Sequence, residues 1–168
     1  NDWPESAQSI IRSPHVTSAP KILDNGQLAI ADWVQNNGIP ADAFVDLGWV
    51  SNSRLPAILN EVDVAIFPSR CEGGTNLAAM ETMASGVPCL LSANTGHLDI
   101  INRSPNCFAL ERQTPSDASD EPDWRDCDVE EIVEKLELAY HKPEQREYVG
   151  ELATQSMAEL SWRKQLDQ

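Results

Sequence analysis

The chain has 168 residues, with 12 lysines and arginines against 27 aspartates and glutamates, and a net charge of −15. This balance argues against a nucleic-acid or anionic-membrane ligand, because both require a basic surface. A site for any other anion must therefore be local and made of backbone amides and a helix terminus. The hydrophobic content of 41% is enough for a core, and the length predicts one domain spanning residues 1–168.

In chain order, the sequence alternates between helical and strand patterns. Apolar spacing, capping residues and glycine or proline stops predict helices over 5–12, 24–38, 51–59, 75–85, 98–102, 129–141 and 143–165, and strands over 43–48, 62–67, 87–91 and 107–110. Gly38 is the expected end of the second helix. This alternation predicts an α/β, Rossmann-like parallel sheet with helices on both faces, followed by two closing helices. Between the last predicted strand and the two closing helices, residues 114–128 are rich in aspartate, and we expect an acidic, mobile loop there.

The four cysteines are widely spaced and form no CxxC pair, so neither a disulfide framework nor a zinc site is expected. Reduced thiols, together with the lack of any signal-peptide or membrane-span pattern, predict a cytoplasmic protein. The chain starts at Asn1 rather than a methionine and stops inside a predicted helix, so we expect a fragment of a larger protein.

The segment from Phe67 to Glu81 is the most informative part of the sequence. A buried strand is expected to end at Phe67, and a glycine loop leads from it into a helix capped by Thr75 or Asn76. Ligands of open α/β sheets bind at the carboxyl ends of the strands, and glycines let the backbone approach them closely. The free amides and the positive end of the helix dipole predict an anion site.

Two carboxylates bracket this predicted anion site, Glu72 in the loop and Glu81 in the second turn of the helix. Carboxylates accept hydrogen bonds from vicinal hydroxyls and repel phosphate. A nucleotide-sugar presents such hydroxyls on both sides of a diphosphate. From residue chemistry alone, both glutamates can equally be ordinary solvated residues near a helix start.

Three motifs of this region resemble a known family. Residues 63–69 (DVAIFPS), 72–74 (EGG) and 80–88 (METMASGVP) resemble the Glu-x7-Glu element of the retaining group 1 (family 4) glycosyltransferases of the GT-B fold. Residues 46–50 (DLGWV) resemble the strand and loop beside the nucleotide base, 95–99 (TGHLD) the GGxPE turn, and 161–162 (SW) a motif near the end of the C-terminal domain. The match is strong over 46–88 and weaker as far as 162.

The resemblance implies a function and roles for individual residues. The chain would be the donor-binding C-terminal domain of a hexosyltransferase that uses a nucleoside-diphosphate sugar without a metal or other cofactor. Glu72 would be catalytic and hold the hydroxyls of the donor sugar, and Glu81 would hold the ribose. The full set of implied or suspected donor-binding residues is Arg70, Glu72, Gly73, Gly74, Thr75, Asn76, Leu77, Glu81, Gly48 and His97.

The sequence departs from the family in two ways. Eight residues separate Glu72 from Glu81 where the family has seven, so either Glu72 or Gly73 occupies the first acidic position. The Arg/Lys pair of the family and the N-terminal acceptor domain are absent from the chain. We therefore expect the isolated fragment to be inactive.

Other residues near the site have open interpretations. His97 can contact the donor or serve another role, Arg70 can bind a phosphate or form a salt bridge, and Cys71 is expected to be a packing residue. Two further functions also stay open at this point. One is a sugar-nucleotide epimerase of similar fold, and the other is a catalytically silent module that binds a nucleotide-sugar.

Overall fold

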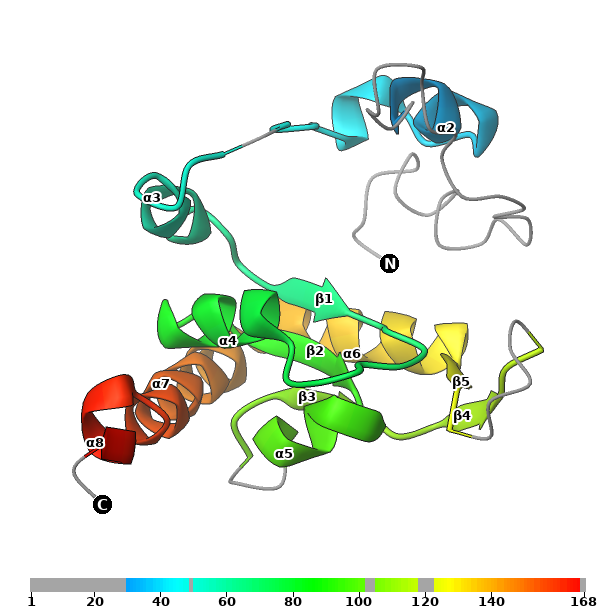
Figure 1. Cartoon of the computed structure of the whole chain (residues 1–168). Helices are drawn as coiled ribbons and strands as arrows, with labels where there is room; N and C mark the ends of the chain where they lie inside the picture. The colour runs from blue at the N-terminus through cyan, green and yellow to red at the C-terminus, as the bar shows by residue number, and fades with distance from the viewer. Residues whose placement is uncertain (1–29, 49, 102–104, 118–122, 167–168) are drawn as a thin grey trace. The chain divides into compact units, whose positions relative to one another are not determined.

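The computed structural model describes residues 30–48, 50–101, 105–117 and 123–166 (Figure 1). The chain divides into two compact units, Asn1–Ser51 and Asn52–Gln168, and each is described by itself. The predicted helix over 5–12 lies outside the described residues. That residues 1–168 form a single nucleotide-sugar-binding domain stays a prediction.

The first unit contains the helix α2 (Ile30–Asn36), which confirms the described part of the helix predicted over 24–38. Gly38 ends it as expected, with a φ of 68° that suits glycine, and the amide of Ile39 donates to the carbonyl of Val34 at 3.1 Å. A 3-10 turn, η1 (Ala41–Ala43), follows.

The strand predicted over 43–48 is wrong. Within the described residues this segment pairs with no strand, and the alternating apolar side chains Val45 and Leu47 are 77% and 58% exposed. Asp46 instead accepts the amide of Gly48 at 2.8 Å, a turn contact that ends any extended run. An alternating pattern of apolar and polar residues forms a strand only when a neighbouring strand pairs with its backbone.

The second unit is built on a parallel sheet. After the helix α3 (Leu55–Leu59), the strands β1 (Ala65–Phe67), β2 (Cys89–Ser92) and β3 (Phe108–Leu110) pair in the order β1-β2-β3. Ile66 lies opposite Leu90, and Leu91 lies opposite Ala109. The three strands predicted over 62–67, 87–91 and 107–110 are thus confirmed, although each begins later than predicted, at Ala65, Cys89 and Phe108.

Helices cover both faces of this sheet (Figure 1), as the sequence predicted. Leu91 belongs to a core shared with α4 (Leu77–Ala84), α5 (Leu98–Ile101) and α7 (Pro143–Glu159). Its neighbour Leu90 points to the other face, into a core with α6 (Val129–His141) and the start of α7. This alternation along β2 buries all four of its residues and fixes the sheet between two helical layers.

The closing helices differ from the prediction only at the end of the chain. The bounds of α6 agree with the predicted 129–141, and its cap Asp128 accepts the amide of Glu131 at 3.0 Å. The helix predicted over 143–165 ends at Glu159, and a separate short helix, α8 (Trp162–Leu166), follows. The described chain therefore closes with three helices rather than two.

The acidic segment 114–128 is not simply a loop. Its ends form an antiparallel hairpin of β4 (Gln113–Pro115) and β5 (Arg125–Cys127), in which Thr114 lies opposite Asp126. Ser116 continues the hairpin by donating its amide to the carbonyl of Trp124 at 3.0 Å. Composition could not reveal this backbone pairing, and it did not indicate that Ser116 is buried. The mobility of the segment stays a prediction. Residues 118–122 lie outside the described part.

All four cysteines are free thiols. Burial raises the pKa of Cys89 and of Cys107 to about 12, and that of Cys127 to about 11. These thiols are therefore protonated and unreactive at neutral pH. In the described part of the chain, no helix has the length and apolar character needed to cross a membrane.

Candidate functional site

The loops that follow the three parallel strands meet at the carboxyl edge of the sheet. The loop after β1 runs from Pro68 to Asn76, and the turn after β2 contains Asn94 and Thr95. Thr95 Oγ1 accepts the amide of Glu72 at 2.7 Å, and Asn94 Nδ2 donates to the carbonyl of Ser69 at 3.0 Å. The second turn thus holds the first, at the edge where open α/β sheets bind their ligands.

The start of α4 is capped by Asn76, one of the two caps predicted from the sequence. Its Oδ1 accepts the amide of Ala79 at 3.0 Å, and its backbone is extended, as in other N-caps. The amides of residues 73–78 donate to no acceptor within the described residues. Six consecutive N–H groups in a glycine loop and at a helix N-terminus are suited to an anion, because they carry partial positive charge without a lysine.

Glu72 lies at the centre of a hydrogen-bond network. Its Oε1 accepts from Ser69 Oγ at 2.6 Å and from Asn76 Nδ2 at 2.9 Å. Within the described part, no hydrogen bond reaches the second carboxylate oxygen, Oε2. The side chain is 24% exposed, so that oxygen is available to a ligand hydroxyl while the first holds the carboxylate in place.

His97 is fully buried behind this network, with no exposed surface. Its Nε2 lies 3.1 Å from Asn76 Nδ2, which can only donate, so Nε2 is the acceptor and the proton is on Nδ1. Nδ1 lies 3.1 Å from the carbonyl of Ser92 and 2.9 Å from its hydroxyl, so the Nδ1 proton has an acceptor in this tautomer.

Burial lowers the pKa of His97, and this effect outweighs both the Ser92 hydrogen bond and the nearby Glu72 carboxylate, which raise the pKa. Glu72 Oε1 is 3.8 Å from Nε2, but a neutral imidazole makes no ion pair with it. Direct contact between His97 and the donor, one of the roles left open by the sequence, stays a prediction; in the structure both ring nitrogens contact Asn76 and Ser92 inside the protein. The contact that the structure shows is with Asn76, which His97 helps to position.

Glu81 lies on the exposed surface of α4, one turn after Leu77, so the two side chains share a face of the helix. Leu77 is 71% exposed, unusual for a leucine at the first helical position. The two residues present an apolar patch followed by a carboxylate. This pairing suits the face and hydroxyls of a nucleoside.

Arg70 adopts the salt bridge that the sequence left open. Its Nε binds Asp126 Oδ1 on β5, and its backbone carbonyl accepts the amide of Arg125 at 3.0 Å. The hydrogen bond from Arg70 lowers the pKa of Asp126. The arginine thus links the hairpin to the loop after β1. Gly48, another predicted donor-binding residue, belongs to the first unit.

Gly96 lies in the turn resembling GGxPE and was not among the predicted site residues. A Cβ built on it would lie 1.7 Å from the carbonyl oxygen of Gly74, so only glycine lets the two loops approach this closely. The preceding Thr95 has a φ of 39°, an uncommon conformation for a threonine. A polar Asn-Thr-Gly run directly after a buried strand was the available signal.

Among the described residues, no group of three or more histidine, cysteine, aspartate or glutamate side chains is gathered as a metal site. The expectation that no metal or cofactor is required stays a prediction.

A comparison with family models bears on this geometry. The model described as glycosyl transferases group 1 matches residues 24–121, more than half of the chain. The chain belongs to this family. The matched range contains α2, the parallel sheet, the loop after β1 and all of α4. No curated protein matched the chain.

Proposed function

We infer that the chain, which belongs to the group 1 glycosyltransferases, takes part in glycosyl transfer, which requires a sugar donor and an acceptor. We propose, more narrowly, that it is the donor-binding domain of a hexosyltransferase that moves a sugar from a nucleoside diphosphate with retention at the anomeric carbon. The observation that carries this proposal is the run of six free amides at residues 73–78, flanked by Glu72 and Glu81.

The diphosphate is assigned to the amides. A protein with a net charge of −15 has little long-range attraction for an anion, so the binding energy must come from short contacts. Backbone N–H groups at a helix N-terminus supply such contacts and also stabilise the charge that develops on the leaving diphosphate.

The two glutamates are assigned to the hydroxyls on either side of the diphosphate. Glu72 is fixed by Ser69 and Asn76 through Oε1 and keeps Oε2 for the donor sugar. Glu81 is exposed beside Leu77 and binds the ribose. The retaining outcome and the hexosyl class are proposed from the resemblance of residues 63–88 to family 4 enzymes, and a cytoplasmic site of action from the widely spaced cysteines.

Substitution of Gly74 tests the assignment of the diphosphate. A Cβ on Gly74 meets no atom within 4 Å, so Gly74→Val should fold normally while its branched side chain covers the free amides. We expect the variant to lose binding of nucleoside diphosphates in calorimetric titration, with an unchanged circular dichroism spectrum. Arg70→Ala is the contrast: its guanidinium is already paired with Asp126, and we expect a loss of about 1 kcal/mol or less. The reverse order of effects would contradict the amide site.

Substitution of Glu81 tests the assignment of the ribose. Glu81→Gln should weaken binding of ribonucleoside diphosphates by about 1.5–3 kcal/mol. The wild type should discriminate against the 2′-deoxy analogue, and the variant should not. Glu130→Gln, an exposed glutamate on α6, is the matched control. Equal discrimination by wild type and Glu81→Gln would place the ribose elsewhere.

Incubation of labelled donor with the chain and a partner acceptor domain distinguishes transfer from the alternatives. A transferred sugar with its anomeric configuration retained supports the proposal. An epimerised donor would indicate an epimerase, and binding without turnover a silent module.

A further inference from the structure

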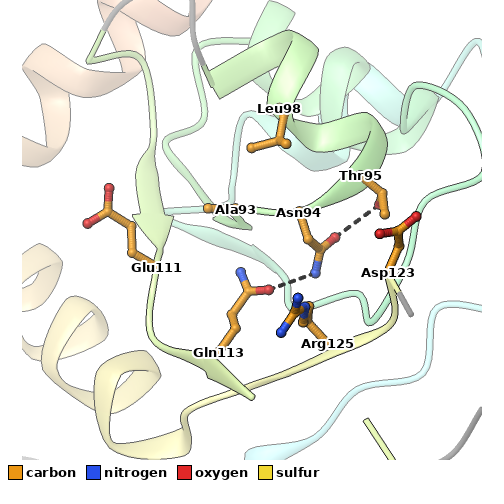
Figure 2. Close-up of a pocket in the computed structure, with 8 residues that line it drawn as sticks. All are labelled: Ala93, Asn94, Thr95, Leu98, Glu111, Gln113, Asp123 and Arg125. Carbon is orange, nitrogen blue, oxygen red and sulfur yellow. Dashed lines mark hydrogen bonds between the residues drawn. The ribbon is translucent and has the colours of Figure 1, made fainter. Parts of the chain in front are cut away.

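A hollow lies beside the loop after β1, on the side of β3 and the hairpin (Figure 2). Its volume is about 530 Å³, within the range of small-molecule sites, about 300–1,000 Å³. The polar side chains around it belong to Asn94, Thr95, Glu111, Gln113, Asp123 and Arg125. Neither Glu72 nor Glu81 lines it, so it is separate from the proposed donor contacts.

The floor of this hollow is held rigidly. Asn94 is 5% exposed, and its Nδ2 donates both to the Ser69 carbonyl and to Gln113 Oε1, each at 3.0 Å. Thr95 Oγ1 donates to Asn94 Oδ1 at 3.1 Å, and Gln113 Nε2 donates to the carbonyl of Leu110 at 2.7 Å. Figure 2 shows Asn94 joined to Gln113 and Thr95, with Arg125 beside them. Such fixed amide groups give a ligand a preorganised surface.

The charged groups at the rim, by contrast, are free. Within the described part of the chain, the side chains of Glu111, Asp123 and Arg125 form no hydrogen bond or ion pair. Arg125 is half-buried between Gln113 and Asp123 in Figure 2 and has five unused donors. A half-buried guanidinium without a partner favours a ligand that can accept from it.

The charges around the hollow indicate which class of ligand it can bind. Two carboxylates and one guanidinium line it, so the hollow is net negative and disfavours a phosphate. Hydroxyl groups both donate and accept, and they satisfy carboxylate, amide and guanidinium groups together. Leu98, 39% exposed at the wall, offers an apolar surface for the C–H face of a ring.

We propose that this hollow is a second sugar site, which binds a neutral pyranose ring carrying no nucleotide. Arg125 donates to ring hydroxyls, Asp123 accepts from them, and the Asn94–Gln113 pair forms the base of the site. The hydrogen bond from Asn94 to Ser69 places this sugar next to the loop that carries Glu72. The proposal does not depend on the assignment of the diphosphate.

The test is a titration of the ¹⁵N-labelled chain with D-glucose, D-mannose, D-galactose and N-acetyl-D-glucosamine, followed by NMR. We expect at least one sugar to shift the side-chain amide signals of Asn94 and Gln113, with a dissociation constant of about 1–10 mM. Arg125→Gln and Asp123→Asn should each raise that constant about tenfold, the effect of one lost charge-assisted hydrogen bond. The matched controls Asp117→Asn, on the same hairpin but outside the hollow, and Arg163→Gln, on α8, should leave it unchanged.

Uridine diphosphate added to saturation distinguishes the two sites. The sugar should remain bound, because the hollow excludes phosphate; this holds whether or not the diphosphate binds at residues 73–78. The proposal is overturned if no sugar shifts these signals at about 50 mM, well above the expected dissociation constant. It is equally overturned if only residues 72–78 respond, if uridine diphosphate displaces the sugar, or if Arg125→Gln binds as tightly as the wild type while retaining the native amide spectrum.

Discussion

Asn76 is both the N-cap of α4 and a member of the Glu72 network, and its replacement by alanine tests both roles at once. All three polar groups of its side chain are used: Oδ1 accepts from Ala79, and the two N–H groups donate to Glu72 at 2.9 Å and to His97 at 3.1 Å. Loss of an N-cap costs about 1 kcal/mol, and leaving a buried acceptor such as His97 Nε2 unpaired costs about 1–3 kcal/mol. We therefore expect Asn76→Ala to lower the free energy of unfolding by about 2–4 kcal/mol.

The variant Asn76→Asp separates the two contributions. Aspartate keeps the cap, but it replaces two donors with a carboxylate next to Glu72 and next to the lone pair of His97. At about pH 8 it should be destabilised by repulsion and by the unpaired imidazole. As the pH falls and His97 takes up a proton, the new carboxylate binds it, so the deficit against wild type should shrink.

The assay is urea denaturation of wild type and both variants at about pH 8 and about pH 6, with Thr75→Ala, the exposed neighbouring residue, as control. An Asn76→Ala variant within about 0.5 kcal/mol of wild type would refute the network, because a surface substitution alone has that effect. An Asn76→Asp deficit that does not change with pH would refute the neutral state of His97.

Three further predictions concern the supports of the site. Gly96→Ala should lower the free energy of unfolding by about 1–3 kcal/mol in thermal unfolding, because its Cβ would lie 1.7 Å from the Gly74 carbonyl; a variant as stable as wild type would show that the loops do not touch. Glu131→Ala removes the buried carboxylate that accepts hydrogen bonds from two backbone amides, at 3.1 and 2.7 Å, and should lower the free energy of unfolding in urea by about 2–4 kcal/mol. The exposed Glu130→Ala is the control and should lie within about 0.5 kcal/mol of wild type. Equal effects of the two substitutions would contradict the contact. Burial lowers the pKa of His97 in the folded chain, so its neutral form stabilises the fold above an unfolded pKa of about 6.5 and less so below it. The stability advantage of wild type over His97→Gln should therefore shrink from about pH 8 to about pH 5, and an advantage that grows would contradict the burial of a neutral imidazole.

The sequence predicted best where the signal is local. The helix α6 has the predicted bounds because its cap, its apolar spacing and the Pro143 that follows all lie within a few residues of its ends. The cap of α4 at Asn76 was predicted for the same reason.

Predictions that depended on distant partners were less reliable. Alternation over 43–48 suggested a strand, but no described strand pairs with that segment, and Val45 and Leu47 remain exposed. Aspartate content over 114–128 suggested a loop, whereas pairing of Thr114 with Asp126 makes a hairpin. The sequence alone does not show which strand lies opposite another, so the pairing and register of strands must be taken from the structure.

The candidate site shows the same division. Glu72, Glu81 and the glycine loop were identified from the chain because they are contiguous and resemble a family motif. The role of His97 could not be identified, since it depends on Asn76 and Ser92 approaching the two nitrogens of one ring. The constraint on Gly96 could not be predicted, because it comes from the carbonyl of Gly74, which is more than twenty residues away in sequence.

The most direct test of the central claim is the amide spectrum of the ¹⁵N-labelled chain during titration with UDP-glucose, GDP-mannose and ADP-glucose. We expect one of these donors to shift the backbone amides of residues 73–78 most strongly, and Gly74→Val to abolish the response without changing the rest of the spectrum. If all three donors leave residues 73–78 unchanged, or if their shifts cluster on another part of the chain, the carboxyl-edge loop is not the donor site.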